Sequence, residues 1–415
     1  MRLLFIGLNA NYINPTNQLI HRMLMLFADT LCFGPGYVSE DELEAGVESF
    51  AEKHGPFDFV ITTSQLALTS NVDIFIKFYK RYAVRRWRND ESLRMFLNDI
   101  QSFLSTQPFK KIVFAMDLDT HGVSADLLCR LDHFADYICA WGKGFSRPCS
   151  ELPNLMLEPA YAKKAQQVSL GLWYDFCNSN FRRFINVGHF VGFDEFCFSP
   201  ISLRKLAVSV PGVLYRSRRQ TLDKLREHSD LRIGSTRYQV LYSILDKLGI
   251  SPYSNPVLHL IYRGLFVNLL SSSKIVMTDG AAYDMMIRKF VEIPAGGSLL
   301  LSRPCAGFDK LGFRDGESAV ILNENDVISQ VRRLLSDHER MQMIASKGQE
   351  IVWRNHSIQA RASQVSRSLV KIMNGSYAGS IWSDGEFQLL EGPNAEVPEC
   401  GLMADSALDS PQCIQ

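Results

Sequence analysis

An alternation of short apolar runs with longer amphipathic segments restricts the fold of this chain more than any other feature of its sequence. Short runs rich in β-branched residues are typical of buried strands in a parallel sheet, and amphipathic segments are typical of the helices that cross between such strands. In the first half of the chain the predicted strands are Leu3–Gly7, Phe57–Thr62, Lys111–Met116 and Asp136–Ala140. The pattern therefore predicts an α/β protein.

The same alternation begins again after Pro200, beyond a turn-rich stretch at Phe193–Ser202. Here the predicted strands are Lys205–Val210, Lys274–Thr278, Ser298–Leu301 and Ala319–Leu322. Two such series predict two Rossmann-like domains that face each other across a cleft, an N-terminal domain over 1–195 and a C-terminal domain over 196–374. From Gly375 the residues are rich in Gly, Ser, Pro, Asp and Glu with little periodicity, so we expect a flexible tail over 375–415.

Composition excludes several classes of protein. Lys and Arg number 44 and Asp and Glu 44, so the chain has no basic excess with which to coat a nucleic acid, and we expect no nucleic-acid partner. No apolar run approaches the roughly 18 residues that span a bilayer. The nine cysteines are scattered and never spaced C-x-x-C, which argues against a disulfide framework or a zinc knuckle and favours a reducing compartment such as the cytoplasm.

A glycine turn followed by arginines is the first candidate for chemistry. Pro211-Gly212 follows a predicted strand, and Arg216, Arg218 and Arg219 lie at the start of the next helix. Such a turn lets backbone N–H groups approach a phosphate, and the helix N-terminus and the arginines add positive charge. Because cations at a helix N-terminus oppose its dipole, a bound anion would relieve a cost. The segment predicts a phosphate site, the alternative being a solvated basic helix start.

The second candidate is the segment from Asp284 to Leu301, which we expect to form a helix over 284–295 followed by a buried strand. A carboxylate such as that of Glu292 can accept both hydroxyls of a ribose, because each of its oxygens is an acceptor. Asp284, eight residues earlier, would then face a different part of the same ligand. From the residues alone, an exposed glutamate is the alternative.

Two further features lie at the end of the predicted strand Lys111–Met116. Asp117 and Asp119 form a D-x-D pattern that could hold a divalent metal against a nucleotide diphosphate, although aspartates at strand ends are commonly turn residues. His121, at the carboxyl end of the strand, could reach into a cleft or be an ordinary loop histidine.

The order of several motifs resembles a known family. The motifs are R-K-F-V-E-I-P-A-G-G-S-L-L-L at 288–301, F-R-D-G-E-S-A-V-I-L at 313–322 and the run L-L-S-D-H-E-R-M at the start of 334–357. Upstream lie V-S-V-P-G-V-L-Y-R-S-R at 208–218 and H-F-V-G-F-D-E-F-C-F-S-P at 189–200. Residues 185–370 resemble group 1 glycosyltransferases of the GT-B fold, especially their spore-maturation-protein branch, whereas the N-terminal half matches them loosely.

The resemblance implies a donor site for a nucleotide diphosphate sugar in the second domain. The acidic pair E-x7-E of the family is matched by Asp284 and Glu292, with Asp in place of the first Glu, and Glu292 would hold the ribose. Gly212, Tyr215, Arg216 and Arg288 would complete the donor site. Arg216, Arg218 or Lys289 would neutralise the departing diphosphate, and His121 would assist at the reacting centre. The family also implies hexosyl or related transfer with retention of configuration, no obligatory metal and no cofactor.

The acceptor is the least defined part of this interpretation, and a glycan, a lipid-linked sugar or a protein would each fit. Six basic residues lie among aromatic ones in 77–88, a pattern typical of a solvated helix face or of peripheral contact with the inner face of a membrane. Two other functions stay open. The chain could bind a nucleotide or glycan without catalysing transfer, or it could be a metal-dependent enzyme built around Asp117 and Asp119.

Overall fold

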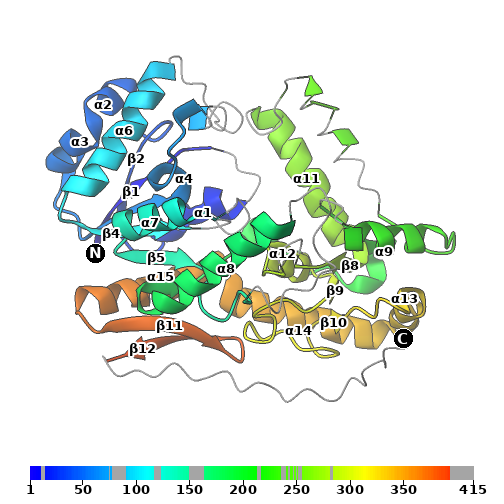
Figure 1. Ribbon diagram of the computed structural model, residues 1–415. Coiled ribbons are helices and arrows are strands. Elements are labelled where there is room, and N and C mark those ends of the chain that lie inside the picture. The colour runs from blue at the N-terminus through cyan, green and yellow to red at the C-terminus, as the bar shows by residue number, and fades with distance from the viewer. Residues whose placement is uncertain are drawn as a thin grey trace, which may run out of the picture.

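The structure, a computed structural model, describes residues 1–10, 15–73, 75–76, 90–115, 123–148, 163–212, 216–234, 255–280 and 284–392, with a few isolated positions between 240 and 250. Asp117, Asp119, His121, Tyr215, the segment 77–88 and residues 393–415 of the expected tail lie outside these ranges. Two separate parallel sheets are present, which confirms the predicted α/β class (Figure 1). Among the described residues, no helix is long and apolar enough to cross a membrane.

The first sheet has six parallel strands in the order β2-β1-β3-β4-β5-β6. They are β1 (Arg2–Ile6), β2 (Asp29–Phe33), β3 (Phe59–Thr63), β4 (Lys110–Phe114), β5 (Tyr137–Ala140) and β6 (Phe184–Asn186). Successive residues of β1 pack into two different hydrophobic clusters, Leu4 and Ile6 into one and Leu3 and Phe5 into the other. This alternation places apolar side chains on both faces of the sheet, so helices must cover both.

The helices of the first half supply that cover. They are α1 (Pro15–Met25), α2 (Glu40–Glu44), α3 (Gly46–His54), α4 (Ser64–Ala67), α6 (Asp90–Thr106), α7 (Ala125–Phe134) and α8 (Lys163–Ser179). The cluster around Leu4 includes buried residues of α2, α3, α4, α6, α7 and α8, whereas that around Leu3 includes residues of α1. Ser39 begins α2 with a capping box that it shares with Glu42, which explains why the acidic run starts a helix there.

The second sheet has four parallel strands in the order β10-β9-β8-β7. They are β7 (Leu206–Ser209), β8 (Ser273–Thr278), β9 (Leu299–Ser302) and β10 (Val320–Ile321). The helices around them are α9 (Arg216–Arg226), α11 (Pro256–Ser272), α12 (Lys289–Ala295), α13 (Val327–Ser336) and α14 (His338–His356). Ile275 and Met277 of β8 pack into a cluster confined to this half, but Val276 joins the cluster around Leu3. The two halves therefore share one hydrophobic core.

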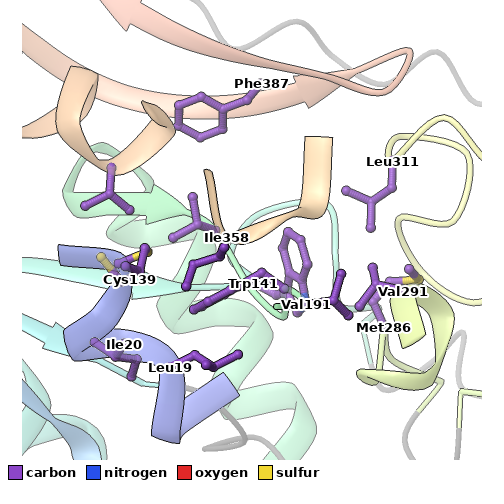
Figure 2. Packing of buried hydrophobic residues seen from close by; sticks show 14 of the residues in the cluster. Leu19, Ile20, Cys139, Trp141, Val191, Met286, Val291, Leu311, Ile358 and Phe387 are labelled. Carbon is purple, nitrogen blue, oxygen red and sulfur yellow. The ribbon is translucent and has the colours of Figure 1, made fainter. Parts of the chain in front are cut away.

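The chain crosses between the halves twice, and the two crossings lie side by side. Val191 N donates to His356 O at 3.0 Å, and Ile358 N donates to Val191 O at 2.9 Å. After the second crossing, α15 (Ile358–Met373) returns to the first half and packs against α1, although the expected C-terminal domain extended to residue 374. Figure 2 shows Ile358 of α15 near Leu19 and Ile20 of α1, together with Val191 and Trp141.

The expectation of a flexible tail from residue 375 is wrong for residues 377–391, which form an antiparallel hairpin of β11 (Tyr377–Ser383) and β12 (Glu386–Glu391). Side chains of β11 bind the outer edge of β6. Ser380 Oγ accepts from Asn186 N at 2.7 Å, Trp382 Nε1 donates to Asn186 O at 2.7 Å, and Tyr377 OH donates to Phe184 O at 2.7 Å. The hairpin thus satisfies backbone groups that an exposed edge strand would leave unpaired.

Candidate functional site

The carboxyl end of the second sheet brings Gly212 and Lys289 together. Gly212 follows β7 with φ 93°, and Lys289 is the first residue of α12. A Cβ atom at position 212 would lie 2.5 Å from Lys289 Cε and 2.8 Å from its Nζ. Only glycine permits this approach, so the backbone of the turn and the lysine ammonium form one surface beside the start of α9.

Lys289 is half-buried, and its charge is not neutralised by an ion pair among the described residues. Burial, and then the positive charge of Arg218, lower the pKa of Lys289 to about 8. An anion bound beside Gly212 would favour the ammonium form. The site can therefore stabilise negative charge on a ligand.

Arg218 lies in the first turn of α9 and is 1% exposed. Its NH2 is 2.7 Å from Oδ1 of Asp279 and 3.1 Å from the carbonyl oxygen of the same residue, which follows β8. Thr278 Oγ1 accepts from the same nitrogen at 3.3 Å. Arg218 thus connects the first turn of α9 to the end of β8. Its NH1 also lies 3.3 Å from the position of a Cβ atom at Gly212, so the positive charge beside the Gly212 turn is partly balanced by Asp279.

Arg288 and Glu292 form a buried network with residues of the first half. Arg288 NH1 pairs with Oε1 of Glu292, and NH2 pairs with Oε2 of Glu195 at 2.7 Å. Arg288 Nε donates to Thr16 Oγ1 at 3.1 Å, and NH2 also donates to Phe190 O at 3.1 Å. Burial opposes the charge on Arg288, but Glu195 and then Glu292 more than offset this and raise its pKa. The network joins α12 to the first half.

Glu292 is therefore not the exposed glutamate that was the alternative interpretation, since it is buried within α12 and one carboxylate oxygen is held by Arg288. The arginine fixes the direction of the carboxylate, as a rigid ligand for paired hydroxyls requires. Whether Glu292 holds a ribose stays a prediction.

Asp284 lies outside α12, because the predicted helix over 284–295 begins only at Lys289. Its φ is 52°, in the left-handed region, which a right-handed helix does not allow, and the next residue, Met285, donates its N–H to Gly280 O at 3.2 Å. The carboxylate is buried, and its Oδ2 is 2.6 Å from Nε of Arg147, which follows β5 in the first sheet. Burial raises the pKa of Asp284 to about 6, and Arg147 opposes that rise.

The carboxyl ends of the two sheets thus meet, because Arg147 and Asp284 follow β5 and β8 respectively. The expected cleft between the halves stays a prediction. Arg216 begins α9, but its side chain, like Tyr215 and His121, lies outside what the structure describes. Within the described ranges, no three His, Cys, Asp or Glu side chains are grouped so as to hold a metal ion, and Asp117 and Asp119 are not among those residues.

Sequence reasoning missed four residues of this region: Thr16, Arg147, Glu195 and Asp279. Asp279 follows a predicted strand directly and could have been found as a strand-end carboxylate. The other three belong to the first half and reach the site only through the docking of the two halves.

Residues 216–367 match a family described as glycosyl transferase-like. No curated protein matches the sequence. Among solved structures, HepE of Anabaena in complex with UDP is 13% identical and is aligned over 89% of this chain and 100% of that chain, with a TM-score of 0.47. HepE in complex with UDP-glucose is 14% identical over the same shares, also with a TM-score of 0.47. Sucrose-phosphate synthase from Thermosynechococcus elongatus is 12% identical over 91% of this chain and 100% of that chain, with a TM-score of 0.47.

Proposed function

We propose that this protein is a glycosyltransferase of the GT-B type that moves a sugar from a nucleotide diphosphate sugar to an acceptor. The observation that carries the proposal is the close packing of the Lys289 ammonium on the Gly212 turn, at the carboxyl end of a parallel sheet. Both α9 and Lys289 lie within the segment that matches the glycosyl transferase-like family.

The reaction needs positive charge where the diphosphate leaves. Lys289 supplies it in a half-buried position, where water screens a charge less than in bulk solvent. The N-terminus of α9 adds a partial positive charge, and the Arg218–Asp279 pair holds that helix end against β8. These groups would stabilise the leaving group without an obligatory metal.

The remaining donor contacts are assigned as follows. Glu292 would accept the ribose hydroxyls with its carboxylate oriented by Arg288, and Asp284 would face the donor sugar. Retention of configuration is part of the proposal and rests on the resemblance to the E-x7-E enzymes. The acceptor would approach from the first half, at the ends of its strands.

A second candidate function is binding of a nucleotide or glycan without transfer. It is favoured by Asp284, where the family has Glu, because its shorter carboxylate is held by Arg147. Hydrolysis of UDP-glucose by the purified protein without acceptor would favour the enzyme, because a protein that only binds the nucleotide sugar does not cleave the bond between sugar and diphosphate.

The test is a thermal-unfolding panel with UDP, GDP, dTDP, CDP and ADP, with NAD as a control and with and without EDTA. A ligand that binds the folded state raises the melting temperature by mass action. We expect one nucleotide diphosphate to do so in the presence of EDTA, and Lys289→Met to abolish the shift. Lys347→Met, which changes an exposed lysine on α14, is the matched control. A panel without any shift for well-folded protein would contradict the proposal.

A further inference from the structure

A cavity of about 630 Å³ lies where the chain crosses between its two halves. Phe193 lines it from the first crossing, and Asn355 and Ser357 line it from the second. Its other walls are α15 and the start of β12. The residues of the Gly212–Lys289 site are not among its lining, so it is a separate site from the one described above.

Aromatic rings form one end of this cavity. The Trp353 ring is 5.6 Å from that of Phe193, and the two residues are 43% and 53% exposed. Phe196 packs edge-on against Trp353 at 4.9 Å and holds the indole in place. Exposed aromatic faces that are fixed by packing offer a platform for the apolar C–H face of a pyranose ring.

Helix α15 lines the cavity with hydrogen-bonding side chains. Gln359, Ser363 and Arg367 are spaced four residues apart on α15, so they lie on one face of the helix. Gln359 Oε1 is buried and has no hydrogen-bond partner in the part of the chain that the structure describes. Glu386, at the start of β12, adds a carboxylate. These side chains supply both donors and acceptors, and the hydroxyls of a sugar can bind either kind.

We propose that this cavity binds an oligosaccharide, with a pyranose ring on Trp353 and Phe193 and with hydroxyls bound by Gln359 and Arg367. A second cavity, of about 540 Å³, shares Arg367 and Phe387 with the first and continues along α15, which gives room for further sugar residues. The inference goes beyond the proposed function and does not depend on it, since a glycan can bind here whether or not the chain transfers sugar.

An acidic peptide is the competing ligand, because Arg354 and Arg367 are both in the lining. Residues 393–415 of the chain have this character, with Glu396, Glu399, Asp405 and Asp409 and no Lys or Arg. The observations favour a glycan, because the carboxylate of Glu386 in the lining would repel an acidic peptide, whereas the exposed rings of Trp353 and Phe193 suit a sugar ring.

The experiment uses the full chain labelled with 5-fluorotryptophan and observed by fluorine NMR. The protein has five tryptophans, and Trp353→Phe assigns the resonance of Trp353, which is 43% exposed. Maltohexaose, cellohexaose, laminarihexaose and chitohexaose are titrated to about 10 mM, which detects binding as weak as millimolar. We expect at least one to shift the Trp353 resonance saturably, while the buried Trp141, Trp173 and Trp382 keep theirs.

Variants then test the wall. Gln359→Ala and Arg367→Ala should each weaken binding of the active hexaose by about fivefold or more. Arg226→Ala, on the exposed surface of α9, should leave it unchanged. No response of Trp353 to any hexaose would overturn the proposal, as would a response that survives both wall substitutions. A synthetic peptide of residues 393–415 that shifts Trp353 when no hexaose does would also overturn it. UDP binding, measured on the same samples, reports separately on the proposed function.

Discussion

Arg147 Nε lies 2.6 Å from Oδ2 of Asp284, and this ion pair joins the loop after β5 of the first sheet to the turn before α12 of the second. Arg288 makes a parallel connection, since it pairs with Glu195 and donates to Thr16. The candidate donor site therefore lies at a junction of two halves that are connected by ion pairs, of which Arg288–Glu195 is buried on both sides.

The pH dependence of the free energy of unfolding should reveal the raised pKa of Asp284. Burial raises the pKa of this carboxyl from 3.8 to about 6, with Arg147 opposing the rise. The folded protein therefore binds more protons than the unfolded chain between these values, and Asp284 makes stability fall as the pH rises through them. Asp284→Asn removes this titration. Relative to the unchanged protein, the free energy of unfolding of the variant should rise by about 2 to 3 kcal/mol from pH 4 to pH 7.

Urea unfolding of both proteins across this pH range measures the difference. Arg147→Gln is the companion variant, because losing the guanidinium should move the Asp284 titration to higher pH. Parallel stability profiles for the Asp284→Asn variant and the unchanged protein would show that Asp284 does not have the raised pKa.

Nucleotide affinity should fall as Lys289 loses its proton. Burial and the charge of Arg218 lower the pKa of Lys289 to about 8, so the ammonium form is present below that pH and is lost above it. UDP affinity, measured by calorimetry, should therefore decrease as the pH rises through 8. Lys289→Met should cost about tenfold or more at pH 7. Lys289→Arg keeps the charge and should make the affinity independent of pH over this range, and an unchanged decline in that variant would exclude Lys289 as its source.

Substitutions of Arg218 and of Lys289 should have different effects on the free energy of unfolding. Arg218→Met removes one buried ion pair, that of Arg218 with the Asp279 carboxylate, and breaking such a pair costs about 3 to 5 kcal/mol. Lys289→Met removes a charge that burial disfavours, so the free energy of unfolding should stay the same or rise. Guanidinium chloride unfolding of the two variants makes the comparison. Equal losses would contradict the assignment of Arg218 to the structure and Lys289 to the ligand.

Truncation should show that the hairpin contributes to stability and that the residues after Gly392 do not. A chain ending at Gly392 keeps every contact of β11 and β12 described above, and should unfold at the same temperature as the full chain. A chain ending at Gly375 exposes the edge of β6 and removes Trp382, whose ring is 5.6 Å from the buried Arg361 guanidinium. It should be less stable and should self-associate through the free edge. Light scattering and thermal unfolding check both expectations, and a stable monomer ending at Gly375 would refute the role of the hairpin.

The strands that the sequence pattern predicted best are those buried on both faces. The runs F-V-I-T-T in β3 and K-I-V-M-T in β8 are apolar and β-branched, so their identity was plain. β2 was missed because its residues D-T-L-C-F are only partly buried. The hairpin was missed because its composition resembles a loop, although Asp384-Gly385, both at positive φ, is a turn signal between two strands.

For the candidate site, the sequence pattern predicted the residues that belong to a single sheet and its helices. Gly212 and Lys289 belong to the ends of neighbouring strands and helices of one sheet, so their proximity follows from the order of the elements. The partners Arg147 and Glu195 could not be predicted in this way. They reach the site only because the two halves dock in one particular way, and that docking depends on side-chain packing over the whole shared core.

The hairpin that covers β6 is synthesised long after β6 itself. Ser380 bonds to Asn186 across 194 residues of sequence. At the usual 5 to 20 residues per second, roughly 10 to 40 s pass between synthesis of that edge and synthesis of the side chains that satisfy it. A nascent chain that ends before residue 380 lacks the side chains that bind β6, so we expect its open edge to be prone to association with other chains or with chaperones.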